Sequence, residues 1–217
     1  MSGQRQLRFR LPGRWFSVDL AGGRSTEESI QRVARDAIGA ADDLAQERAT
    51  VRRELHAAVE AATVDEARSL MFAKEITAGV PLPVTLAVFE PAKLRMSPAI
   101  GTDAPAVLHV MAESLKQIDP TAHASMVETA GPGVPALRTH FVEPSDAGEG
   151  MLRLVADYWV PVPESKQILM VRFSTPLGEL ENMMCALFDE LIGAAYFSEA
   201  NAASLREALT RPDAESR

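Results

Sequence analysis

Residues 151–197 read MLRLVADYWVPVPESKQILMVRFSTPLGELENMMCALFDELIGAAYF, and the architecture expected for the whole chain follows from them. The first ten residues and the run QILMVRF at 167–173 are apolar segments typical of strands covered on at least one face. Only PVPESK at 161–166 separates them, and its two prolines donate no backbone hydrogen bond. So short a connection favours an antiparallel hairpin over a parallel crossover.

A long helix is expected directly after this hairpin. Ser174 or Thr175 can cap it, and Pro176 suits the first helical position, where no backbone donor is needed. Apolar residues then recur at spacings of three and four, which is typical of a helix with one buried face. They are Leu177, Leu180, Met184, Leu187, Phe188, Leu191 and Ile192. The nearest surface that could bury this face is the hairpin, so we expect the helix to pack on a sheet.

Short strand patterns and turn signals continue upstream of this stretch. One further helix is predicted at 104–118, with Asp103 as its cap, and a short one at 200–209. The segment 68–77 fits a strand but could also be helical. The other predicted strands are 6–10, 15–20, 84–89, 124–129 and 136–142. Short turns between strands favour an antiparallel sheet, so the predicted class is α+β, an antiparallel sheet flanked by helices in an α/β/α sandwich.

A long helical segment is predicted at 25–62, opened by a capping box of Ser25 and Glu28. Gly39 lies inside it, so the sequence leaves open one kinked helix or two helices. Apolar residues at Ile30, Ala37, Leu44, Val51 and Ala58 are spaced by seven, which would suit a short coiled coil. A helix packed on the sheet is favoured instead, because the companion positions of that repeat include charged Glu47 and Glu54.

Length and charge narrow the class of protein. The chain has 217 residues, enough for one domain, with a core at about 7–20 and 68–197 and a tail at 198–217. Its net charge is −8, which argues against nucleic acid as a partner. No apolar run is long enough to cross a membrane, and the basic N-terminal residues lack the apolar core of a signal peptide. We therefore expect a cytoplasmic protein.

The closing residues also resemble a known fold family. The strand pair DYWVPVP…QILMVRFSTP followed by the helix LGELENMMCALFDELIGAAYF looks like the end of the Mog1/PsbP-like fold, a central antiparallel sheet between helices. The pattern is similar to that of LpqN-type actinobacterial lipoproteins and is matched best over residues 68–197. The resemblance implies a binding or assembly protein without a shared active site, and the Ala-rich, Arg-for-Lys composition suits an actinobacterium. Because neither a signal peptide nor a lipobox cysteine is recognised in the sequence, we do not expect export or lipid anchoring as in the exported members.

Catalytic and metal-binding motifs are missing from the sequence. It contains no GxSxG, GxGxxG or GxxxxGK[ST]. His56, His109, His123 and His140 show no HxH, HxxxH or HExxH spacing, so neither a metal nor a cofactor is expected. Cys185, the single cysteine, is interpreted as a small buried side chain rather than a nucleophile.

One enzymatic alternative stays open. If the strands at 124–129 and 136–142 form a hairpin, His123 and His140 approach each other, and a nearby carboxylate would complete an acid–base site of a hydrolase type.

The candidate interface residues are aromatic and basic. They are Trp15, Phe16, Arg52, Arg53, Tyr158 and Trp159. Exposed aromatic side chains would anchor a protein partner, whereas their strand context favours the core.

The first functional hypothesis is therefore a non-enzymatic protein-interaction or assembly module, secretion- or envelope-associated, in an actinobacterial cell. The alternative is a small-molecule or lipid binder with a pocket between the sheet and a helix. The sequence leaves the partner and the oligomeric state open.

Overall fold

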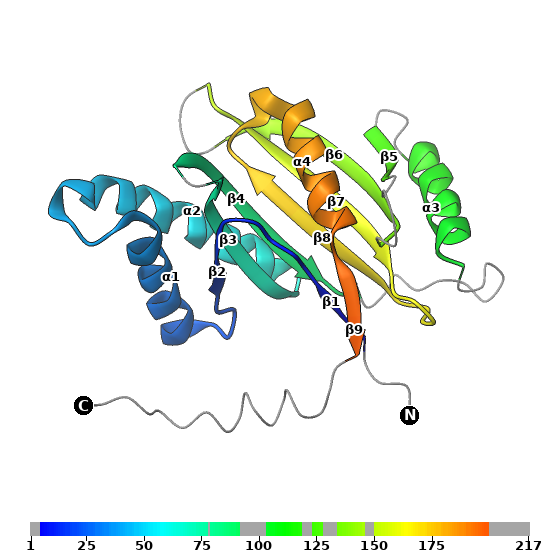
Figure 1. The fold of residues 1–217 in the computed structure, drawn as a ribbon, viewed down its shortest axis with the longest axis horizontal. Coiled ribbons are helices and arrows are strands. Elements are labelled where there is room, and N and C mark those ends of the chain that lie inside the picture. Colours follow the sequence, from blue (N-terminus) through cyan, green and yellow to red (C-terminus); the bar gives the residue numbers. More distant parts are fainter. Residues whose placement is uncertain are drawn as a thin grey trace.

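A seven-stranded antiparallel sheet with helices on both faces forms the centre of the protein (Figure 1). The structure is a computed structural model, and it describes residues 5–77, 79–91, 103–118, 123–127, 134–145 and 150–199. The strand order is β2-β3-β4-β8-β7-β6-β5, and β1 pairs with β9 in a separate two-stranded sheet. This confirms the predicted α+β class with a sheet flanked by helices.

The strands follow the predicted pattern closely. Antiparallel pairing joins β7 to β8 as a hairpin, in which Leu154 lies opposite Thr175 and Pro161 opposite Ile168. The ambiguous segment at 68–77 is a strand. The strands of the large sheet are β2 (Arg14–Val18), β3 (Ala67–Thr77), β4 (Val80–Phe89), β5 (His123–Val127), β6 (Ala136–Pro144), β7 (Leu152–Pro161) and β8 (Ile168–Thr175).

The segment predicted at 25–62 forms two helices. These are α1 (Gly23–Ile38) and α2 (Ala45–Val64), joined through a 3-10 turn, η1 (Asp42–Leu44). Gly39 ends α1 at φ +105°, a conformation that favours glycine. The alternative of a continuous coiled coil over 25–62 is therefore wrong. Its repeat residues Ile30 and Val51 instead share one buried cluster, on two helices that pack against each other.

Two of the three predicted helix caps are wrong because their hydroxyl groups bond elsewhere. Ser25 lies inside α1 and donates to Asp19. Ser174 and Thr175, the alternative caps predicted for the last helix, both lie in β8, and Thr175 donates to the Pro83 carbonyl oxygen at 2.8 Å. Residues 176–180 separate β8 from that helix. After the 3-10 turn η2 (Gly178–Leu180), α4 runs over Glu181–Gly193. Asp103 is confirmed as the cap of α3 (Ala104–Ile118), since it accepts from the Ala106 amide at 3.1 Å.

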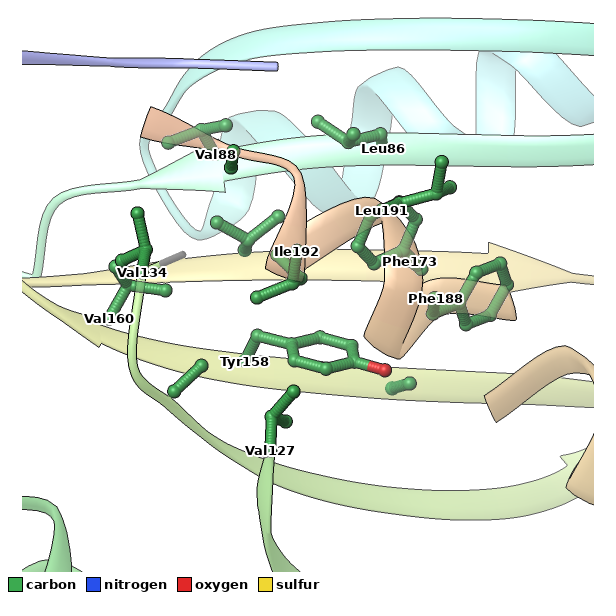
Figure 2. Packing of buried hydrophobic residues seen from close by; sticks show 14 of the residues in the cluster. Leu86, Val88, Val127, Val134, Tyr158, Val160, Phe173, Phe188, Leu191 and Ile192 are labelled. Carbon is green, nitrogen blue, oxygen red and sulfur yellow. The ribbon is translucent and has the colours of Figure 1, made fainter. Parts of the chain in front are cut away.

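The first face of the large sheet is covered by α4, whose predicted apolar stripe is buried as expected (Figure 2). The rings of Phe173 and Phe188 stack with centroids 4.6 Å apart, and Tyr158 meets Phe173 edge-on at 5.6 Å. Cys185 lies in the same cluster, which confirms its prediction as a buried side chain. The exception in the stripe is Leu180, which lies in η2 and is exposed.

The second face carries two separate helical groups. Helices α1 and α2 pack on β2, β3 and β4, with Leu55 of α2 fully buried among Leu70 and Phe72. At the other end of the face, α3 packs through Leu108 against Leu137 of β6. Trp159 of β7 contacts the buried clusters of both groups. The middle of this face is where the candidate site lies.

The two-stranded sheet joins segments from the two ends of the chain. In it, β1 (Arg5–Arg8) pairs with β9 (Tyr196–Glu199). The predicted extension of the last helix to Phe197 is therefore wrong: α4 ends at Gly193, and Tyr196 and Phe197 are strand residues because they pair with β1. The predicted helix at 200–209 lies outside the described residues.

Candidate functional site

A cavity of about 240 Å³ lies between α2 and the second face of the sheet. One wall is α2, and the floor is formed by strands β3, β4, β8, β7 and β6. We call this space the α2 groove. The predicted alternative of a pocket between the sheet and a helix therefore has a structural counterpart.

The wall of the α2 groove is a row of small side chains. Ala57, Ala58, Ala61 and Ala62 line it, and residues three and four apart share one face of a helix. Alanine extends only a methyl group toward the sheet, so the helix leaves space where larger side chains would fill it. Arg53 and Glu54 continue the same face toward the N-terminal end of α2.

The floor is built from side chains that cross-strand pairing brings into line. Thr85, Ser174, Val155 and Phe141 stand opposite one another on four neighbouring strands. Phe141 is 48% exposed, which makes it a large apolar side chain open to solvent at the edge of the cavity. The floor thus offers an aromatic and aliphatic surface together with the hydroxyl groups of Thr85 and Ser174.

A network of charged side chains borders the α2 groove at Arg172. Arg172 of β8 donates from Nε and Nη2 to the two carboxylate oxygens of Asp157, at 2.7 and 2.9 Å. Its Nη1 donates to Asp65, just after α2, at 3.2 Å, and its guanidinium lies 5.7 Å from the centre of the Phe89 ring. These bonds raise the pKa of Arg172, with the bond to Asp157 as the main cause. All three arms of the guanidinium are therefore engaged.

The lining of the groove also includes a second ion pair and one half-buried carboxyl group. Arg153 donates from Nε to Glu143 at 2.9 Å. Glu54 of α2 also lines the cavity, and burial raises the pKa of its carboxyl group, an effect that the positive charge of Arg53 opposes. Arg53 itself is exposed to solvent.

The predicted approach of His123 and His140 is confirmed, on the first face of the sheet. The two residues are directly opposite each other on β5 and β6, and their ring centroids are 5.3 Å apart. His140 Nε2 lies 2.9 Å from a carboxylate oxygen of Glu181 on α4, whereas its Nδ1 is buried without a partner. Burial lowers the pKa of His140, and Arg138 and His123 act in the same direction.

Polar residues near the histidine pair form hydrogen bonds between α4 and the sheet. Glu181, Cys185 and Asp189 are spaced by four and face β6 and β7. Asp189 accepts from Arg138 at 2.5 Å and from the Tyr158 hydroxyl at 2.8 Å. Burial raises the pKa of the Cys185 thiol, which disfavours the thiolate that a nucleophile requires. Within the described part of the chain, no three His, Cys, Asp or Glu side chains could hold a metal ion together.

The histidine pair and the α2 groove are on opposite sides of the sheet. His140 and Phe141 are successive residues of β6, so their side chains point to opposite faces. The histidines therefore do not line this cavity.

The predicted interface residues do not form one surface. The predicted interface role of Tyr158 is wrong, because its side chain is fully buried and its hydroxyl group donates a hydrogen bond to Asp189. Trp15 is half-buried against the same cluster, whereas Phe16 and Trp159 are half-buried on the other face. This division follows from the period of two along a strand, which sends neighbouring side chains to opposite faces. Arg52 and Arg53 are exposed on α2.

The sequence analysis missed most of the α2 groove. The spacing of seven predicts Ala58 as an apolar residue of the helical segment, but it does not take in the grouping of four alanines at 57, 58, 61 and 62. That grouping was the available signal, because small residues on one helix face mark a close approach or a space. Phe141 had no comparable signal, since the exposure of a strand aromatic depends on what covers its face.

Comparison with known proteins gives a solved structure but no family. No protein-family model matches the sequence, and a search of curated proteins finds no match. Among solved structures, the chain is similar to LpqN of Mycobacterium tuberculosis, described as involved in cell envelope biogenesis. The TM-score is 0.41 at 13% sequence identity, and the match covers 90% of this chain and 85% of that chain. The helices in the described ranges are too short or too polar to cross a membrane. The Mog1/PsbP-like resemblance and the actinobacterial source stay predictions.

Proposed function

We propose that this chain is a non-enzymatic binding protein that holds a small apolar molecule in the α2 groove. The observation that carries this proposal is the cavity of about 240 Å³ lined by four alanine methyl groups, Val155 and the exposed ring of Phe141. Ligand sites are typically concave, mostly apolar and supplied with a few polar groups, and the α2 groove has these features.

The size of the cavity points to a small ligand. Pockets for drug-sized molecules usually enclose roughly 300–1,000 Å³. The α2 groove is slightly smaller, so a molecule with a short aliphatic chain or a single ring suits it better than a long lipid.

The charges around the groove support binding rather than catalysis, because the half-buried carboxyl group of Glu54 has no second proton-exchanging side chain bonded to it in the described part of the chain. A general acid or base must reach the substrate with a group that can exchange a proton. Arg172 and Arg153 are each held in ion pairs, and the histidine pair lies on the opposite face of the sheet.

The test is a titration with 1-hexanol, a neutral probe, followed by NMR of alanine methyl groups. We expect saturable shifts at Ala57, Ala58, Ala61 and Ala62. The variant A61F should abolish these shifts because its ring fills the groove. The matched control A49F places the same ring at an exposed position of α2 outside the groove lining and should keep them. Equal binding by A61F and A49F would refute the proposal, and so would wild-type protein that binds neither 1-hexanol nor another probe with the same six-carbon chain.

A second candidate function is the protein-interaction module. One observation favours it: the α1–α2 pair lies at one end of the molecule (Figure 1), and Arg52 is exposed there. This candidate retains the secretion or envelope setting that the sequence resemblance implies.

Photo-crosslinking tests this second candidate. A benzoylphenylalanine at position 52 should capture one defined partner in cells, whereas the same group at exposed position 190 on α4 should not. Identical adducts from both positions would count against a partner surface on α2.

A further inference from the structure

We infer that the ligand of the α2 groove is a small primary amine with an apolar body, and that the carboxylate of Glu54 holds its ammonium group. This inference rests on the proposed function, since it assigns the chemical class of the molecule bound in the same groove.

The first argument is the state of the carboxylates around the groove. Glu143 accepts from Arg153, while Asp157 and Asp65 accept from Arg172. Glu54 also lines the cavity, but no hydrogen bond or ion pair joins it to another residue in the described part of the chain. Among the carboxylates at this site, Glu54 alone has its full acceptor capacity free for a ligand.

The second argument is the cost of leaving that carboxylate half-buried. A charged group that loses water without gaining a partner is destabilised, and burial accordingly raises the pKa of Glu54. An ammonium group supplies up to three donors and a positive charge, so it would form the charge-assisted bonds that Glu54 lacks.

The third argument concerns the alternative of an anionic ligand. The carboxylate of an anionic ligand would need a free cation inside the groove, but Arg172 and Arg153 are already paired with carboxylates of the protein. Arg53 is exposed and therefore hydrated, so water weakens the electrostatic stabilisation that it could give to an anion bound in the groove. An anion would also meet the negative charge of Glu54.

The position of Glu54 fits a molecule with one polar end. Glu54, Ala58 and Ala62 are spaced by four and line the same cavity. At 1.5 Å per residue, the distance from Glu54 to Ala62 along the helix axis is about 12 Å. A short alkyl chain can therefore lie on the alanine wall while its ammonium group contacts Glu54.

The experiment compares three probes with the same chain: hexylammonium, 1-hexanol and hexanoate. Their affinities are measured by alanine methyl NMR at pH 7.5 on the full chain. We expect hexylammonium to bind about tenfold more tightly than 1-hexanol, as for one charge-assisted hydrogen bond, and hexanoate to bind most weakly. In E54Q the preference for the amine over the alcohol should disappear.

The control E60Q makes the same charge change at an exposed position of α2 outside the groove, and it should retain the preference. A preference for hexanoate, or an amine preference that survives in E54Q, would overturn the assignment of the amine while leaving the binding function intact. If none of the three probes shifts the alanine methyl groups, both the amine assignment and the proposed function are wrong.

Discussion

At the scale of single residues, charged side chains in the strands are paired according to the face on which they lie. Arg138 and Arg172 both lie on central strands, yet Arg138 bonds to Asp189 of α4 and Arg172 to Asp157 on the groove side. Removing one partner of such a pair leaves the other buried without compensation, which costs more than the pair contributes. His140 lies on the same face as Arg138, and its protonation affects the stability of the fold near neutral pH.

We predict that His140 makes the protein less stable in mildly acidic solution. In the unfolded chain, a histidine binds a proton with a pKa of about 6.5, whereas burial lowers the pKa of His140 in the folded protein. Between these two values the unfolded state binds more protons, so the free energy of unfolding falls as pH decreases from about 6.5. Below the folded pKa the contribution levels off.

The groups facing His140 include Glu181, whose contact opposes the effect, and Arg138 and His123, which reinforce it. Urea unfolding at pH 7.5, 6.5 and 5.5 should show a smaller loss of stability for H140Q than for the wild type. H109Q changes an exposed histidine on α3 and serves as the control. An equally steep pH dependence in H140Q would contradict the assignment.

At the scale of elements, the junction between β8 and α4 shows how packing sets a helix start. The sequence predicts a helix from Pro176, but the chain first passes Gly178 close to Leu152 at the start of β7. A Cβ atom on Gly178 would lie 2.8 Å from the Leu152 Cβ and 2.9 Å from its carbonyl carbon. Because backbone atoms are involved, rotation of a side chain cannot relieve the contact.

We predict that G178A lowers the free energy of unfolding by about 1–3 kcal/mol, the usual cost of overpacking. Urea denaturation of wild type and variant measures this directly. E179A, at the exposed neighbouring position, should change stability by less than about 0.5 kcal/mol. A neutral G178A would mean that η2 can move away from Leu152 without loss of packing.

At the scale of the whole molecule, one set of strands supports both helical layers. Tyr158 faces α4, whereas Trp159, the next residue, contacts the clusters of the opposite face. Losing β7 would therefore remove the floor of both layers, which favours a single cooperative unfolding transition.

The two tryptophans report on opposite faces and allow this to be tested. W159F leaves Trp15, which packs on the cluster around α4, and W15F leaves Trp159. In each variant, we predict that the urea midpoint from tryptophan fluorescence coincides with that from far-ultraviolet circular dichroism. A fluorescence transition that precedes the loss of secondary structure in either variant would show that one layer unfolds independently.

Local pattern was enough for most strands of the large sheet and for its antiparallel character. The hairpin of β7 and β8, the stripe on α4 and the cap at Asp103 depend on residues close in sequence, and each was predicted. The approach of His123 and His140 also followed from the pairing of two neighbouring strands.

The remaining features depend on contacts between distant residues, which periodicity does not encode. Thr175 is held in β8 by a bond to Pro83, 92 positions away, so it cannot cap a helix. The α2 groove exists because α2 and α3 cover different strands of one face and expose Phe141 between them. An alanine-rich helix face looks the same in sequence whether it is buried or lines a cavity, and only the placement of α2 on the sheet distinguishes the two.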